Sequence, residues 1–173
     1  MHLEGDANDY VGKGMTGGKL VIHPPRDISY DAHDSAIMGN TCLYGATGGK
    51  LFAAGRAGER FGVRNSGAIA VVEGIGDNGC EYMTGGIVAV LGPVGVNFGA
   101  GMTGGFAYLM DDGDDLDNRV NAELVDVMPI EDKAILAEHL RGLINQHYEE
   151  TGSDHSLSLL TDFAATLKRF KLI

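Results

Sequence analysis

The stretch Thr84-Gly85-Gly86-Ile87-Val88-Ala89-Val90 carries the pattern that decides the fold. It consists of a hydroxyl residue, a glycine, a small residue and a run of mostly apolar residues. The same pattern occurs at 16–22, 47–53, 66–72, 84–90 and 103–109. Counted from glycine to glycine, the last three steps are 19, 18 and 19 residues long, and the first is 31. A repeat of this length is typical of a solenoid in which successive coils stack on one another.

Apolar and mixed positions alternate within each copy. Counted from the glycine, the fourth and sixth positions are always apolar, whereas the third and fifth include Lys19, Lys50 and Tyr108. This period of two predicts a strand of about five residues whose fourth and sixth side chains point inward and whose third and fifth point outward. At about 3.3 Å per residue, one period gives a closed path of about 60 Å, enough for a coil of several short strands around a thin core.

Glycine makes up 27 of the 173 residues. We interpret the repeated glycines as corners, because a tight corner needs backbone angles that glycine tolerates, and small residues let neighbouring coils approach. The hydroxyl residues before them are expected to stack in a ladder: Thr16, Thr47, Ser66, Thr84 and Thr103. The predicted fold class is mainly β, a right-handed parallel β-helix over 1–112, with the handedness inferred from general chirality.

The rest of the chain has a different character. The long first step contains a polar insertion near 24–31, and 113–129 is predicted to be an acidic linker and extended segment. In 130–173 the apolar period predicts two helices, which would pack on the side or the end of the solenoid. Gly152 is placed to end the first helix, and Ser153 or Asp154 to cap the second. Their apolar stripes are Leu136, Leu140, Leu143 and Ile144, then Leu157, Leu160, Phe163, Ala164 and Leu167.

Charge and composition exclude several classes of protein. The chain has 24 acidic and 13 basic residues and a net charge of −11, which argues against a nucleic-acid or an anionic-membrane partner. No apolar run approaches the length of a membrane span. The only cysteines, Cys42 and Cys80, are too few for a disulfide scaffold, so we expect a soluble protein of the cytoplasm.

Motifs that carry chemistry are weak in this sequence. The pattern Gly-x-Gly-x-x-Gly occurs three times, beginning at Gly12, Gly74 and Gly99, and each copy lacks the long helix that a dinucleotide site needs. We interpret all three as coil corners. The six histidines have no metal-site spacing and are expected at the surface, and Cys42 and Cys80 are expected as buried residues in strands before the corners. We therefore assign no catalytic, cofactor-binding or metal-binding residue.

Two longer phrases are more specific than these glycine patterns. They are Gly5-Asp6-Ala7-Asn8-Asp9-Tyr10-Val11-Gly12-Lys13-Gly14 and Gly39-Asn40-Thr41-Cys42-Leu43-Tyr44-Gly45-Ala46-Thr47-Gly48-Gly49. Together with 54–68 and 95–105, they resemble the C-terminal glycine-repeat (GXGXG) domain of the glutamate synthase large subunit. The resemblance runs from about residue 3 to the end of the chain. A related glycine-repeat module occurs in formylmethanofuran dehydrogenase.

The resemblance implies a parent enzyme that makes two glutamates from glutamine and 2-oxoglutarate, with NADPH-derived electrons passing through FMN and an iron–sulfur cluster. The family's glutaminase nucleophile is an N-terminal cysteine, whereas this chain starts Met1-His2, and no cysteine cluster is present for an iron–sulfur centre. No cofactor is therefore expected in this chain itself. The resemblance implies a scaffold that packs against the amidotransferase and FMN-binding synthase domains, with the small subunit as a further partner.

Three alternatives remain open at this point. The chain is either an excised domain or a free-standing subunit that assembles with separately encoded catalytic subunits. The repeat begins near Tyr10 without a preceding cap, which favours excision and predicts self-association through the uncapped N-terminal coil. A β-helix hydrolase or lyase with its own groove, using acids such as Asp77 and Glu81, is the remote alternative.

Overall fold

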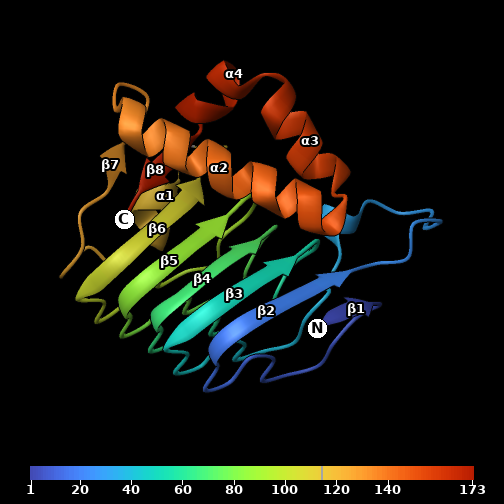
Figure 1. Cartoon of the computed structure of the whole chain (residues 1–173). Coiled ribbons are helices and arrows are strands. Elements are labelled where there is room, and N and C mark those ends of the chain that lie inside the picture. The colour runs from blue at the N-terminus through green and yellow to red at the C-terminus, as the bar shows by residue number, and fades with distance from the viewer. Residues whose placement is uncertain (114) are drawn as a thin grey trace.

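A computed structural model describes residues 1–113 and 115–173; Asp114, in the predicted acidic linker, lies outside the described residues. The parallel strands lie side by side as rungs of a β-solenoid, and helices cover one face of the resulting sheet (Figure 1). The sheet order is β1-β2-β3-β4-β5-β6-β8-β7, and its last two strands are β8 (Phe170–Leu172) and β7 (Met128–Pro129). The parallel strands are β1 (His2–Glu4), β2 (Thr16–His23), β3 (Gly48–Ala53), β4 (Ser66–Val72), β5 (Thr84–Val90) and β6 (Gly104–Met110). The predicted parallel β-helix is confirmed.

Each coil contains a single β-strand, so the expectation of several short strands per coil is wrong. On the opposite side of the coil, the chain forms a turn in which every second residue has a left-handed backbone. In one such turn, Asn78, Cys80 and Tyr82 have φ of 61°, 54° and 55°. The Cys80 N–H donates to the Phe61 carbonyl of the preceding coil, 2.7 Å away. The Asn78 and Tyr82 N–H groups donate to the following coil. These bonds between coils offset the cost of left-handed backbone, about 1 kcal/mol or more per non-glycine residue.

The same alternation recurs in every coil and explains many of the glycines. It occurs at Tyr10, Gly12 and Gly14; Thr41, Leu43 and Gly45; Arg60, Gly62 and Arg64; and Asn97, Gly99 and Gly101. Two of the three Gly-x-Gly-x-x-Gly patterns thus begin in turns that precede a strand, as predicted. Cys42 and Cys80 lie in these turns rather than in strands, which corrects our placement, although both are buried.

From β3 onward, the first glycine of each repeat is required by close approach of the preceding coil. A Cβ on Gly48 would lie 2.7 Å from the Thr16 carbonyl oxygen, and Gly67, Gly85 and Gly104 are at least as restricted. The register pairs the hydroxyl residues with glycines, since Thr16 is opposite Gly48. The predicted hydroxyl ladder is therefore wrong, because each hydroxyl residue lies beside a glycine of the next coil.

Two apolar cores share the sheet. The fourth and sixth positions of each repeat point into the solenoid, where Val88 and Val90 are fully buried with Phe61 and Phe98 from the turns. The fifth position faces the other side, as the alternation predicts, but helices cover it. This outer core contains Val21, Phe52, Val71, Ala89 and Tyr108 from the sheet.

The covering helices begin after β7 (Met128–Pro129). Helix α2 (Ala134–Thr151) lies across the sheet (Figure 1) and ends at Gly152, which has φ of 70° as its predicted role requires. The predicted second helix is two helices, α3 (Asp154–Thr161) and α4 (Phe163–Lys168). Asp162 divides them, because its side chain accepts from the Ala165 N–H and starts α4.

The C-terminal end of the solenoid is closed by elements that the periodicity did not predict. Strand β8 (Phe170–Leu172) pairs antiparallel with β6, and β7 pairs with β8. Helix α1 (Leu116–Arg119) contributes Leu116 to the inner core. At the other end, the insertion between β2 and β3 forms a loop that includes the short helix η1 (Ala32–Asp34).

Candidate functional site

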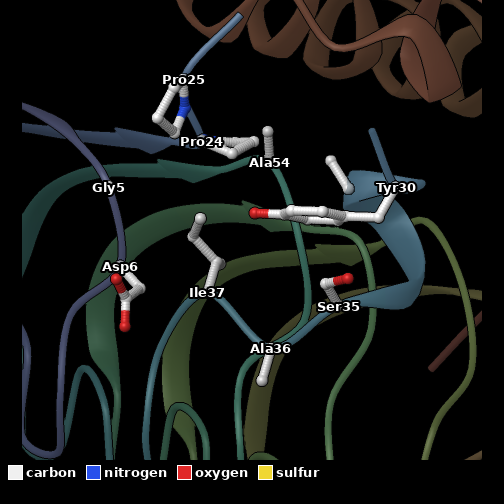
Figure 2. A pocket seen from close by; sticks show the side chains of 10 residues that line it. Gly5, Asp6, Pro24, Pro25, Tyr30, Ser35, Ala36, Ile37 and Ala54 are labelled. Atoms are coloured by element: carbon white, nitrogen blue, oxygen red, sulfur yellow. The ribbon is translucent and has the colours of Figure 1, made fainter. Parts of the chain in front are cut away.

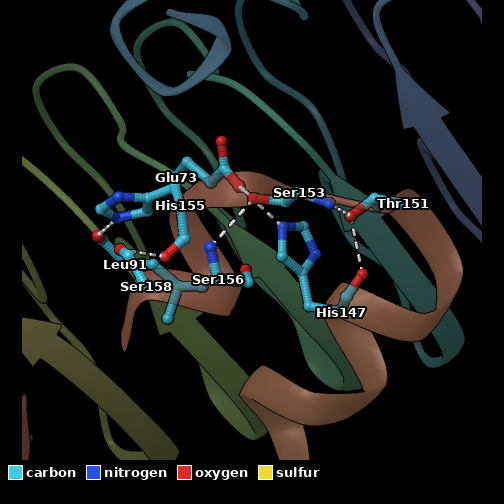
Figure 3. Close-up of polar contacts among 8 residues, drawn as sticks. All are labelled: Glu73, Leu91, His147, Thr151, Ser153, His155, Ser156 and Ser158. Carbon is cyan, nitrogen blue, oxygen red and sulfur yellow. Dashed lines mark hydrogen bonds and ion pairs between the residues drawn. The ribbon is translucent and has the colours of Figure 1, made fainter. Parts of the chain in front are cut away.

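A buried polar cluster joins the solenoid to its helical cover. Glu73 directly follows β4, His147 lies in the last part of α2, and Ser153 precedes α3. Glu73 and His147 have no exposed surface, and the His147 Nε2 lies 3.1 Å from Glu73 Oε1. The Ser153 hydroxyl donates to the same oxygen (Figure 3). A single carboxylate oxygen thus fixes the position of the α2–α3 junction on the sheet.

The backbone around this junction is arranged by local hydrogen bonds. The Thr151 hydroxyl donates to the His147 carbonyl at 2.7 Å, and the left-handed Gly152 then reverses the chain. Ser153 caps α3, since its Oγ accepts from the Ser156 N–H at 3.1 Å. Ser153 was one of the two caps predicted from the sequence. Its hydroxyl therefore both starts α3 and binds Glu73.

The Glu73 carboxyl is ionised in spite of its burial. Burial by itself raises its pKa, but the hydrogen bond and the charge of His147, followed by the Ser153 hydrogen bond, outweigh this effect. The net result is a pKa below the ordinary value. A buried carboxylate of this kind is stabilised only while its donors stay in place.

The cluster contains a serine, a histidine and a glutamate, but it is not arranged as a catalytic triad. In a triad the histidine accepts the proton of the serine hydroxyl. Here Ser153 and His147 both donate to Glu73, and the serine oxygen accepts from a helix N–H. The geometry therefore suits a structural clasp rather than nucleophilic attack.

Sequence reasoning missed this cluster. His147 is buried, so the expectation that every histidine lies at the surface is wrong for it. One signal in the sequence could have indicated Glu73. Counted from the glycine, the seventh position of the repeat holds an acidic residue only in the third copy. The five residues at this position are His23, Ala54, Glu73, Leu91 and Met110. A buried acid at the end of an apolar strand requires a partner, but its identity depends on where α2 lies.

The other residues weighed from the sequence do not form a reactive site. Burial raises the pKa of the Cys80 thiol to about 12 and also raises that of Cys42, which makes both poor nucleophiles. Asp77 accepts from the Val96 N–H at 2.8 Å, and Glu81 lies 3.9 Å from Arg60. Across residues 1–113 and 115–173, no three or more His, Cys, Asp or Glu side chains gather where they could hold a metal ion.

Two hollows flank the insertion between β2 and β3. A smaller one of about 300 Å³ lies where Tyr30 extends over Ile37 and Ala54, with Asp6 on the other wall (Figure 2). A larger cleft of about 830 Å³ separates the insertion from the α2–α3 junction, and Glu73 contributes to its lining.

A third feature is an apolar groove along α2. It has a volume of about 650 Å³ and is lined by Ile69 of the sheet and by Ile135 and Leu143 of α2, among others. Ile135 is 86% exposed, and Phe106, at the third position of the last repeat, is 54% exposed. Lys50 and Glu138 also line this groove.

These features define a β-solenoid domain with a filled interior. The GXGXG motif family matches residues 1–173, and the chain belongs to this family. It is 55% identical over 170 residues to the glutamate synthase [NADH] of Schizosaccharomyces pombe and 54% identical to the ferredoxin-dependent glutamate synthase 2 of Synechocystis. It is 51% identical to the chloroplastic ferredoxin-dependent glutamate synthase of Spinacia oleracea.

These matches cover 98% of this chain but only 8%, 11% and 10% of the three relatives, respectively. The chain thus corresponds to about a tenth of each glutamate synthase. The resemblance to the GXGXG domain of glutamate synthase is confirmed. None of the helices in the described part of the chain combines the length and the hydropathy needed to span a bilayer.

Proposed function

We propose that this chain is the scaffold segment of a glutamate synthase and is not catalytic by itself. It would hold the amidotransferase and FMN-binding synthase domains in register, with the small subunit as a further partner. The observation that carries this proposal is the coverage: nearly the whole chain matches about a tenth of each relative. The filled interior and the absence of a triad within the buried cluster support a structural role.

The reaction proposed for the whole enzyme is the formation of two glutamates from glutamine and 2-oxoglutarate with a reductant. NADPH remains our proposal for the electron source, although the relatives are named for NADH and for ferredoxin. Because the chain is almost equally similar to relatives named for either donor, we infer that this segment does not select the donor. The cytoplasm remains the proposed compartment, while the spinach relative's name assigns that protein to the chloroplast.

The residues of this chain do not fit the cofactors that the resemblance implies. An iron–sulfur cluster needs several cysteine ligands, whereas Cys42 and Cys80 are the only cysteines and are buried in the inner core. A flavin phosphate could use the N–H groups of a glycine turn, but those of Gly14, Gly45 and Gly99 already donate to carbonyl oxygens of neighbouring coils. We therefore derive no reaction step on this chain, and the cofactors would be bound by other domains of the enzyme.

A chimaera tests the scaffold role. The matching segment of the S. pombe enzyme is replaced by this chain, and glutamine-dependent glutamate formation is measured together with the assembly of the purified protein. We expect an active, assembled enzyme. Phe106→Asp combined with Ile135→Asp should reduce assembly and activity together, because the first places charge on an exposed apolar residue of β6 and the second places charge in the apolar groove along α2. The matched control is Val96→Asp, at a residue that is 50% exposed in a turn of the solenoid.

Two outcomes would contradict the proposal. One is an isolated chain that forms glutamate from glutamine and 2-oxoglutarate without other domains. The other is an S. pombe enzyme that keeps full activity and assembly after the segment is deleted. If this chain restores activity when added as a separate polypeptide to the deleted enzyme, the free-standing subunit becomes the better interpretation.

A further inference from the structure

The larger cleft has one wall from the insertion and one from the α2–α3 junction. The insertion contributes Arg26 and Tyr30, and the junction contributes Thr151 and Ser153. Glu73 also lines this cleft, although its side chain has no surface open to bulk water. A cleft of about 830 Å³ is large enough to admit a small organic group or a long side chain.

The two oxygens of Glu73 differ in their hydrogen bonding. Oε1 accepts from both His147 and Ser153, whereas Oε2 is buried and has no hydrogen-bond partner among the residues that the structure describes. Figure 3 shows Oε2 pointing away from the His147 and Ser153 side chains. An ionised oxygen without a donor carries a full desolvation penalty, so a donor that enters the cleft would bind there favourably.

The donors of this cluster that have partners are directed to other acceptors, and among the described residues His147 Nδ1 and Ser156 Oγ, which are also buried without a partner, make no hydrogen bond to Glu73. The Ser153 hydroxyl and the His147 Nε2 are directed to Oε1, and the His155 Nε2 lies 2.6 Å from the Leu91 carbonyl. Asp31 and Asp154 add negative charge to the walls of the cleft. Arg26 also lines the cleft and is exposed. The missing donor is therefore best supplied from outside the chain by a group that carries positive charge.

We propose that the cleft between the insertion and the α2–α3 junction binds a cationic nitrogen group, an alkylammonium or a guanidinium, which donates an N–H to Glu73 Oε2. The group belongs either to a free small amine or to a lysine or arginine side chain of a partner polypeptide. This proposal does not depend on the scaffold role, since it rests on the contacts of Glu73 alone.

The test uses the 173-residue chain and n-butylammonium chloride, titrated at constant ionic strength and at pH 8, where an ordinary histidine is uncharged. The readouts are the side-chain carboxyl ¹³C resonance of Glu73 and the amide resonances of Ser153 and His155. We expect saturable shifts at millimolar concentrations. Tetramethylammonium, which has the same charge but no N–H, should bind at least about tenfold more weakly, since charge-assisted hydrogen bonds contribute at least this factor.

Two variants provide independent checks. Glu73→Gln replaces the carboxylate and should weaken binding about tenfold or more. Because Glu73→Gln could also unfold the junction, Ser29→Phe serves as a second variant, which fills the cleft from its exposed rim without touching the Glu73 hydrogen bonds. Equal binding of the two ammonium ions would overturn the proposal. A Glu73 carboxyl resonance that does not move would also overturn the proposal, since a bound water would then already donate to Oε2.

A blocked lysine, N-acetyl-lysine N-methylamide, distinguishes the two sources of the cation. If it binds about tenfold more tightly than butylammonium, backbone contacts contribute and the cation is a polypeptide side chain. If it binds equally or more weakly, a free amine is the better source. If neither compound binds, the cleft does not recognise cationic nitrogen. The same conclusion follows if Glu73→Gln leaves the affinity for butylammonium unchanged.

Discussion

The inner and the outer core share one sheet but differ in how they are built. The inner core consists of equivalent positions from successive coils, such as Val72 and Val90, and each layer repeats the one before. The outer core combines the other face of the sheet with α2. The α2 side chains in it, such as Leu140 and Ile144, do not belong to the repeat. Within residues 1–113 and 115–173, the buried ionic cluster of Glu73 and His147 adjoins the outer core. A repeated core needs no specific partner, whereas a core between unlike elements uses polar contacts to fix their relative position.

The largest effect is expected from placing a charge in the inner core. Val88→Asp should prevent folding or cost at least about 4 kcal/mol in the free energy of unfolding, because Val88 is fully buried among apolar side chains. Lys50→Asp is the matched variant on the other face, where the Lys50 Nζ makes a 3.2 Å hydrogen bond to Gln146. It should cost less than about 1 kcal/mol. Similar urea unfolding curves for the two variants would refute the assignment of inward and outward positions.

A smaller and local effect is expected at the clasp of the outer core. His147→Ala should cost about 3 kcal/mol, because it leaves the buried Glu73 carboxylate with one donor. Amide hydrogen exchange should increase in α2 and α3 more than in β4 and β5. The control is His139→Ala, which removes an exposed imidazole 2.8 Å from the Tyr108 hydroxyl and should cost about 1 kcal/mol. Uniform loss of protection across both cores would contradict a separate role for the clasp.

The clasp should also make stability depend on pH. The pKa of Glu73 is lower in the folded chain than its ordinary value of 4.5. Its stabilising contribution is therefore present above pH 4.5 and is lost as the pH falls through the folded-state pKa. Urea midpoints measured between pH 6 and pH 3 should fall more steeply for the wild-type chain than for Glu73→Gln. Parallel curves would mean that Glu73 adds nothing to the acid sensitivity of the fold.

The smallest effect concerns the two ends of the inner core. One end is closed by α1 and Leu116, whereas at the other Leu3 and Val11 are only partly buried, beside the short edge strand β1. We expect this 173-residue chain to self-associate weakly through the β1 end, because an edge strand offers unpaired backbone groups. Sedimentation at micromolar concentration should show dimers. A monomer at every concentration would show that β1 is sufficient to close the solenoid.

The period-two alternation of apolar residues was almost sufficient by itself to predict which positions form the inner core. The fourth and sixth positions, such as Val88 and Val90, are buried as the alternation requires, and Gly152 ends α2 as predicted. The turn side of the coil was not predicted, because nine non-glycine residues there adopt a left-handed backbone, and most of them, such as Leu43 and Cys80, are of types that rarely do so. The break at Asp162 was also missed, since an uninterrupted apolar spacing hides a change of helix direction.

The amino-acid sequence by itself determined the β-helix, its coil length and its membership of the GXGXG family, because these follow from short-range repeats and specific phrases. Only the tertiary structure decided which face the helices cover and that Glu73 meets His147. The physical reason is that the repeat acts between neighbouring coils about 19 residues apart, whereas the clasp joins residues 74 positions apart. No local pattern encodes such a contact; it arises only when α2 packs on the sheet.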